Sequence, residues 1–116
     1  MAAVGYEDAL ARYRLVVSNF PGVEVKGKAN PYTSLNGNMF SFLDKSGSLC
    51  LRYPKADRVA FLEEHKLPPV TQYGAIMKEY VSVPAHIAAD PTALNACFET
   101  CVTYAKSLPV KATKRS

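Results

Sequence analysis

The fold of this chain is decided by the stretch Gly37-Asn-Met-Phe-Ser-Phe-Leu-Asp-Lys-Ser-Gly-Ser-Leu-Cys-Leu-Arg-Tyr53. Two short apolar runs flank Asp44-Lys-Ser-Gly47, a set of turn-forming residues, and this arrangement predicts a β-hairpin. If Leu43 faces Ser48, one face of the hairpin is apolar and consists of Phe40, Phe42, Leu49 and Leu51. The same register places Met39, Ser41, Cys50 and Arg52 on the other face.

Helices and further extended segments surround the hairpin. Apolar residues spaced by three and four predict helices over Tyr6–Ser18 and from Asp90 to Leu108, with Asp90 as N-cap and Pro91 in the first turn. Pro54 starts a helix that runs to His65 and buries Val59, Leu62 and Phe61. Alternation predicts strands over Val23–Lys28 and Met77–Val83, whereas 29–37 and 67–74 read as loops. We therefore expect an α+β domain over 1–108, an antiparallel or mixed sheet with helices packed on one face, and a basic flexible tail over 109–116.

Composition favours an ordinary globular domain. The 116 residues fit one hydrophobic core, and no apolar run reaches the ~18–20 residues that span a bilayer. The first residues lack the basic and apolar regions of a secretory signal, and three cysteines do not form a disulfide framework. These features predict a cytoplasmic protein with reduced thiols.

The net charge of +4 is unevenly distributed. Residues 1–105 contain ten Lys/Arg and ten Asp/Glu, and the excess consists of Lys106, Lys111, Lys114 and Arg115. A solvated terminus accounts for such a run. The alternative is weak, salt-sensitive nucleic-acid binding through this basic tail together with Lys26 and Lys28.

Four segments carry a family resemblance: Asn30-Pro-Tyr-Thr-Ser34, Gly37–Leu43, Leu49-Cys-Leu-Arg52 and Met77-Lys-Glu-Tyr-Val-Ser-Val-Pro84. They resemble small proteins similar to the N-terminal domain of the competence regulator TfoX, over roughly Tyr6 to Lys106. The related YjbR/MmcQ group and the type III secretion chaperones are similar in layout. The resemblance implies an α+β fold and a regulatory or DNA-binding role, and it supplies no catalytic residues.

The three cysteines and two histidines are the candidates for metal binding or nucleophilic catalysis. Cys97 and Cys101 lie on one helical face and could bind a metal, but a pair alone is not a zinc signature, so both read as small buried hydrophobes. His65 is expected at a helix end and His86 in a loop, without an acid or nucleophile beside either. We therefore expect no catalytic residues, no metal and no cofactor.

A group of mainly polar side chains on the predicted strands is the candidate binding surface. We expect it on the sheet face turned away from the helices, where cations and phenols could bind an anion or an acidic peptide. Apolar Met39, Leu43 and Cys50 on this face would favour a protein partner or a homodimer. The function expected is that of a non-enzymatic adaptor or regulatory module. The candidate residues are Lys26, Tyr32, Thr33, Met39, Cys50, Arg52, Lys78 and Tyr80.

Overall fold

The computed structural model describes residues 6–27, 31–67, 70–72 and 75–109. One antiparallel sheet has the strand order β1-β2-β3-β6, and a separate two-stranded pair consists of β4 and β5. These elements confirm the α+β class. In chain order they are α1 (Tyr6–Val17), β1 (Tyr32–Leu35), β2 (Asn38–Leu43), β3 (Leu49–Arg52), α2 (Lys55–His65), β4 (Thr71–Gln72), β5 (Ala75–Ile76), β6 (Tyr80–Ser82), α3 (Ala85–Ala88) and α4 (Pro91–Ser107).

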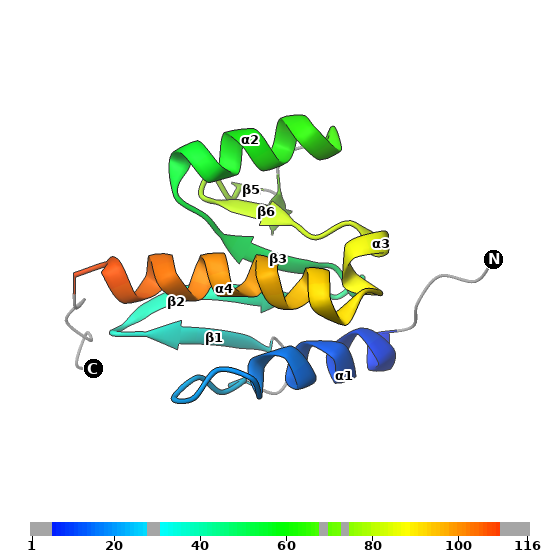
Figure 1. Cartoon of the computed structure of the whole chain (residues 1–116), viewed down its shortest axis with the longest axis vertical. Helices are drawn as coiled ribbons and strands as arrows, with labels where there is room; N and C mark the ends of the chain where they lie inside the picture. The colour runs from blue at the N-terminus through cyan, green and yellow to red at the C-terminus, as the bar shows by residue number, and fades with distance from the viewer. Residues whose placement is uncertain (1–5, 28–30, 68–69, 73–74, 110–116) are drawn as a thin grey trace.

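The helices form a layer against the sheet. Helix α4 crosses one face of the sheet with α1 beside it, and α2 lies next to the β6 edge (Figure 1). Short α3 turns the chain from β6 into α4. Helices packed on one face were expected, but α3 was not, because four residues after Pro84 give no periodic pattern. Among the described residues, no helix has the length and apolarity needed to cross a membrane.

The three longer helices begin and end close to where the apolar spacing and proline placed them. The Asp90 carboxylate accepts hydrogen bonds from the Thr92 and Ala93 amides, so it caps α4 as expected. Helix α2 follows Pro54 and buries Phe61. The prediction for Val59 is wrong: its side chain is 45% exposed, because the face of α2 that contains Phe61 packs inward instead.

The extended segments before the hairpin differ from the prediction. Residues 23–27 form no strand, and only Lys26 pairs with Tyr32 through a single bridge. Strand β1 instead lies inside the expected loop 29–37. Asn36 and Gly37 explain this, since both have positive φ, 54° and 80°. An Asn-Gly pair in this conformation makes the two-residue turn that best joins antiparallel strands, so β1 and β2 form a second hairpin.

The register of the decisive hairpin is shifted by one residue. The Asp44–Gly47 turn is confirmed, but Leu43 pairs with Leu49 and Phe42 with Cys50. On the other side of β2, Thr33 pairs with Ser41 and Ser34 with Met39, which leaves Phe40 as a β-bulge. The bulge turns Phe40 and Ser41 both toward the helices. The single apolar face of Phe40, Phe42, Leu49 and Leu51 is therefore wrong, because Phe42 lies on the opposite face.

The segment after α2 also departs from expectation. The expected loop 67–74 contains β4 in its described part, and the Met77 amide donates to the Val70 carbonyl. The expected strand over Met77–Val83 shortens to β6, since 77–79 form a turn.

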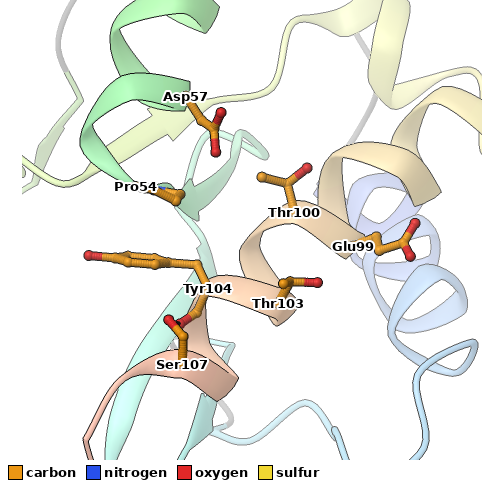
Figure 2. Close-up of a pocket in the computed structure, with 7 residues that line it drawn as sticks. All are labelled: Pro54, Asp57, Glu99, Thr100, Thr103, Tyr104 and Ser107. Carbon is orange, nitrogen blue, oxygen red and sulfur yellow. Dashed lines mark hydrogen bonds between the residues drawn. The ribbon is translucent and has the colours of Figure 1, made fainter.

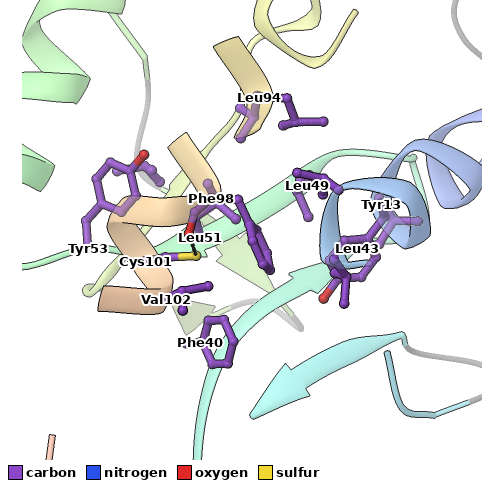
Figure 3. Close-up of a cluster of buried hydrophobic side chains, with 14 of the residues drawn as sticks. Tyr13, Phe40, Leu43, Leu49, Leu51, Tyr53, Leu94, Phe98, Cys101 and Val102 are labelled. Atoms are coloured by element: carbon purple, nitrogen blue, oxygen red, sulfur yellow. Dashed lines mark hydrogen bonds between the residues drawn. The ribbon is translucent and has the colours of Figure 1, made fainter. Parts of the chain in front are cut away.

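The main core lies between the sheet and α1 and α4 (Figure 3). Phe98 of α4 is fully buried at its centre, with the rings of Tyr13, Phe20 and Phe40 around it. Leu43 also belongs to this core, which corrects its expected position on the outer face. Leu94, Cys101 and Ala105 share the buried face of α4, as its spacing predicted.

Candidate functional site

The sheet face turned away from the helices is largely covered. Phe42, Cys50 and Tyr80 are buried there together with Val70, which comes from the segment leading into β4. Tyr32, Met39 and Met77 pack around this second cluster and are half-buried. The expected open polar surface is therefore wrong for Cys50 and Tyr80. The physical reason is that Phe42, turned outward by the bulge, needs apolar cover.

Arg52 and Tyr80 stabilise the sheet rather than present free polar groups. Their guanidinium and hydroxyl both donate to the Met39 carbonyl beside the bulge, at 3.4 and 3.0 Å. Arg52 also forms an ion pair with Glu79 at 2.5 Å. Burial raises the pKa of Tyr80 to about 12, although the nearby Arg52 partly opposes that shift. The charge of Arg52 is thus already matched within the chain.

Thr33 lies on the helix side of the sheet, so its predicted place on the far face is wrong. Its hydroxyl is fully buried on the helix side and bonds to Ser41, which in turn bonds to the Tyr13 hydroxyl at 2.6 Å. Burial raises the Tyr13 pKa well above its usual value. These three hydroxyls form a closed structural network, and none of them is available to a partner.

The remaining candidate cations are scattered. Lys26 is exposed and its Nζ donates to Ser34, while Lys78 is exposed in the turn before β6. Lys106 is exposed in the last turn of α4. The described residues contain ten Lys/Arg and ten Asp/Glu, so the basic excess lies entirely outside them. The predictions for Lys28, Lys111, Lys114 and Arg115 likewise fall outside the described residues.

The three cysteines are at least half-buried, and the two histidines lie on α2 and α3. Cys50 and Cys101 are buried and Cys97 is half-buried. Burial, helped by the Asp44 carboxylate, raises the Cys50 pKa to about 12, and burial raises that of Cys101 well above normal. His65 ends α2 as expected, but His86 lies in α3 rather than in a loop. The centroids of the His65 and His86 rings are 5.8 Å apart. Within the described ranges, no three His, Cys, Asp or Glu side chains gather as a metal site.

A groove between α2 and α4 is the surface that the sequence prediction missed. Two open hollows, of about 430 and 320 Å³, share Asp57 and Thr100 and so form one continuous depression. Tyr53 and Phe61 form its floor, with their rings 5.5 Å apart, and the Tyr53 hydroxyl donates to the Cys97 carbonyl. We call this depression the α2–α4 groove. Its lining is Tyr53, Pro54, Asp57, Ala60, Phe61, Glu64, Ala96, Cys97, Glu99, Thr100, Thr103, Tyr104 and Ser107.

The charged side chains that line the α2–α4 groove are acidic. Asp57 faces Thr100 across the hollow, whereas Glu99 points to the other side of α4 (Figure 2). Glu64 lines the other half of the groove with its side chain 73% exposed. In the part of the chain that the structure describes, Asp57 and Glu64 are thus the carboxylates that face the groove, and no Lys or Arg belongs to its lining. Two guanidinium groups come near the lining, but both have partners within the chain. Arg52 lies 5.9 Å from the Tyr104 ring and pairs with Glu79, and Arg58 donates to the Tyr53 carbonyl at 3.2 Å.

A sequence signal for the groove exists on both helices. Asp57, Ala60, Phe61 and Glu64 follow the i, i+3, i+4, i+7 spacing of one helical face. On α4 the small and hydroxyl residues Ala96, Thr100, Thr103 and Ser107 repeat in the same way. The signal is weak because an apolar stripe marks a buried helix face, whereas carboxylates beside alanine and threonine are typical of an ordinary solvated surface.

Comparison with known proteins gives no identity. No protein-family model matches the chain, and no curated protein matches it. The resemblance to the TfoX N-terminal domain stays a prediction that rests on the residues alone.

Proposed function

We propose that this chain is a non-enzymatic binding module that holds a basic, amphipathic segment of a partner protein in the α2–α4 groove. The observation that carries the proposal is the lining itself: among the described residues that line the groove, carboxylates border an apolar floor and none is Lys or Arg. This keeps the adaptor or regulatory function expected from the sequence. It moves the binding surface from the far sheet face to the helices.

The chemistry of the groove fits a peptide better than a small molecule. The depression is long and open, since it follows α4 from Ala96 to Ser107, about 16 Å at the rise of an α-helix. An amphipathic helix laid in such a groove places apolar side chains on Tyr53 and Phe61. Its Lys or Arg side chains then meet Asp57 and Glu64, which supply orientation more than affinity.

Binding without catalysis is supported by the state of the reactive groups. The thiols of Cys50 and Cys101 are protonated at neutral pH because burial raises their pKa. Burial also raises the pKa of the Tyr53 hydroxyl, which donates its hydrogen bond to the Cys97 carbonyl. Nucleic acid is a poorer partner for this site, because its phosphates would face Asp57 and Glu64.

The test uses the full chain and a fluorescein-labelled peptide of three Leu-Lys-Lys-Leu repeats, with the matching Leu-Glu-Glu-Leu peptide as the opposite-charge probe. Fluorescence anisotropy should detect binding of the lysine peptide only. The double variant D57N/E64Q should weaken it about fivefold, since exposed ion pairs contribute 0.2–1 kcal/mol each. Glu63→Gln, exposed on α2 outside the groove, is the matched control.

A second pair of variants separates shape from charge. Ala60→Trp fills the groove and should abolish binding, whereas Ala56→Trp, exposed on the same helix but outside the lining, should not. Equal affinity of both peptides, or equal loss in both tryptophan variants, contradicts the proposed function. A labelled DNA duplex binding more tightly than the lysine peptide would favour the nucleic-acid alternative.

A further inference from the structure

A separate hollow, of about 540 Å³, lies at the opposite side of α4 from the α2–α4 groove. This volume is within the range of cavities that hold small ligands. Its walls come from α1, the β2–β3 turn, α3 and the start of α4, so four separate segments of the chain converge on it. We call it the α1–α3 cavity. It shares no lining residue with the α2–α4 groove.

The floor of the α1–α3 cavity is apolar. Leu43, Leu49 and Leu94 line it and are all buried members of the main core, close to Tyr13 (Figure 3). On its outer wall, Ala9, Ala85, Ala88 and Ala89 present only methyl groups. Small side chains on one wall and leucines on the floor leave room for an alkyl chain or a ring. Such a surface gains free energy when apolar atoms displace water from it.

Among the described residues, Arg12 is the single Lys or Arg that lines this apolar hollow, and the exposed imidazole of His86 lines it as well. Arg12 of α1 is half-buried and lines both the α1–α3 cavity and an adjoining hollow of about 100 Å³. Its guanidinium forms no ion pair or hydrogen bond with any other residue in the described part of the chain. Asp8, one helical turn earlier, is exposed and does not pair with it. Arg12 therefore has donors to offer to a ligand.

The nearest carboxylate in the β2–β3 turn is already committed. Asp44 accepts hydrogen bonds from the Ser46 and Ser48 amides, both at 2.9 Å, and from the Ser46 hydroxyl at 2.6 Å. These bonds hold the turn and direct that carboxylate into its own backbone. Ser46 and Ser48, which line the cavity, leave polar atoms at its mouth. An anion entering beside Arg12 thus meets a guanidinium with its fork of donors free.

We propose that the α1–α3 cavity binds a small amphipathic carboxylate, with its alkyl or aromatic body on Leu43, Leu49 and Leu94 and its carboxylate on Arg12. The inference is independent of the peptide-binding function, because the two sites share no residue. A bound ligand would contact α1, α3 and the hairpin turn together, so it would also tie these segments to one another.

The experiment records amide ¹H–¹⁵N spectra of the full chain with octanoate and with octylammonium, which have the same alkyl chain and opposite charges. Octanoate should shift the amides of residues 46–49 and 85–89, and octylammonium should not. Arg12→Gln should weaken octanoate binding roughly tenfold, the effect of losing one charge-assisted hydrogen-bonded contact. Arg14→Gln, exposed on the same helix and outside the lining, is the matched control.

Three results overturn the inference: equal shifts with both ligands, shifts confined to the α2–α4 groove, or equal weakening by the Arg12 and Arg14 variants. Ala85→Phe gives a further check, because Ala85 is exposed and a phenyl ring there would enter the cavity mouth without changing the core. This variant should keep its thermal unfolding midpoint and lose octanoate binding. Retained binding with an unchanged midpoint contradicts the proposed site. Neither result affects peptide binding in the groove.

Discussion

The substitution Ser41→Ala tests the bulge that reorganises the decisive hairpin. Because the bulge turns Ser41 toward the helices, its Oγ bonds to both the Tyr13 and Thr33 hydroxyls in a fully buried position. Alanine fits the space but leaves two buried hydroxyls without a partner. Each unsatisfied group costs about 1–3 kcal/mol, so two of them should lower the free energy of unfolding by about 2–6 kcal/mol.

The matched change is Tyr13→Phe, which removes one end of the same network. Ser41 and Thr33 still satisfy each other in this variant, so the expected loss is only about 1 kcal/mol. The double variant should cost less than the two single losses added together, because the Tyr13–Ser41 bond can be lost only once. Ser82→Ala, half-buried on β6, should stay within about 0.5 kcal/mol of wild type.

Urea denaturation followed by circular dichroism measures these free energies, with an unchanged slope as the sign that the unfolding reaction is the same. A neutral Ser41→Ala would refute the reasoning. It would mean that Ser41 faces solvent, as an unbulged strand would place it. A Ser41→Ala loss equal to that of Tyr13→Phe would refute the three-hydroxyl network but not the bulge.

Three further predictions concern the turn, the thiols and alkaline pH. Gly47 has φ of 92°, and an added Cβ would be in ordinary contact with the Ala9 Cβ at 3.5 Å and the Tyr6 Cα at 3.8 Å. Gly47→Ala should therefore cost about 1 kcal/mol through backbone strain alone, measured by thermal unfolding, and an unchanged midpoint contradicts this. Iodoacetamide at pH 8 should alkylate half-buried Cys97 before Cys50, whose pKa burial raises to about 12, and peptide mass spectrometry that finds Cys50 first disproves it. Burial raises the pKa of Tyr80 to about 12, against about 10 in the unfolded chain, so the folded chain holds this proton more tightly. The resulting contribution to the free energy of unfolding is fully present below pH 10 and is lost as pH rises through 12. Tyr80→Phe should therefore reduce the drop in stability between pH 8 and 11, and an identical drop would speak against the assignment.

The helices and the fold class were predictable from the sequence because their signals are local. Pro54 and Asp90 mark helix starts through backbone geometry that tertiary contacts do not change. The Asp44–Gly47 turn was predictable for the same reason, since its hydrogen bonds lie within five residues. Asn36-Gly37 carried an equally local hairpin signal, which the run of turn-forming residues around it obscured.

The faces of the sheet could not be predicted, because they depend on a single unpaired residue. Alternation assigns Phe40 and Phe42 to one face, and only the pairing of Thr33 with Ser41 and of Ser34 with Met39 reveals the bulge. The predicted binding surface depended on the same assignment of faces and is wrong for the same reason. Thr33 points inward, and the segment at Val70 covers Cys50 and Tyr80. The α2–α4 groove joins residues forty apart in sequence, so no local pattern could have paired its two walls.

The central claim is that carboxylates on α2 select a basic segment for the groove. A charge reversal tests it most directly: the full-chain double variant D57K/E64K is titrated with the two labelled peptides of opposite charge. The account predicts that this variant loses the Leu-Lys-Lys-Leu peptide and gains the Leu-Glu-Glu-Leu peptide, with an unchanged thermal midpoint, because both positions are exposed. A variant that keeps the wild-type preference for the lysine peptide would contradict it.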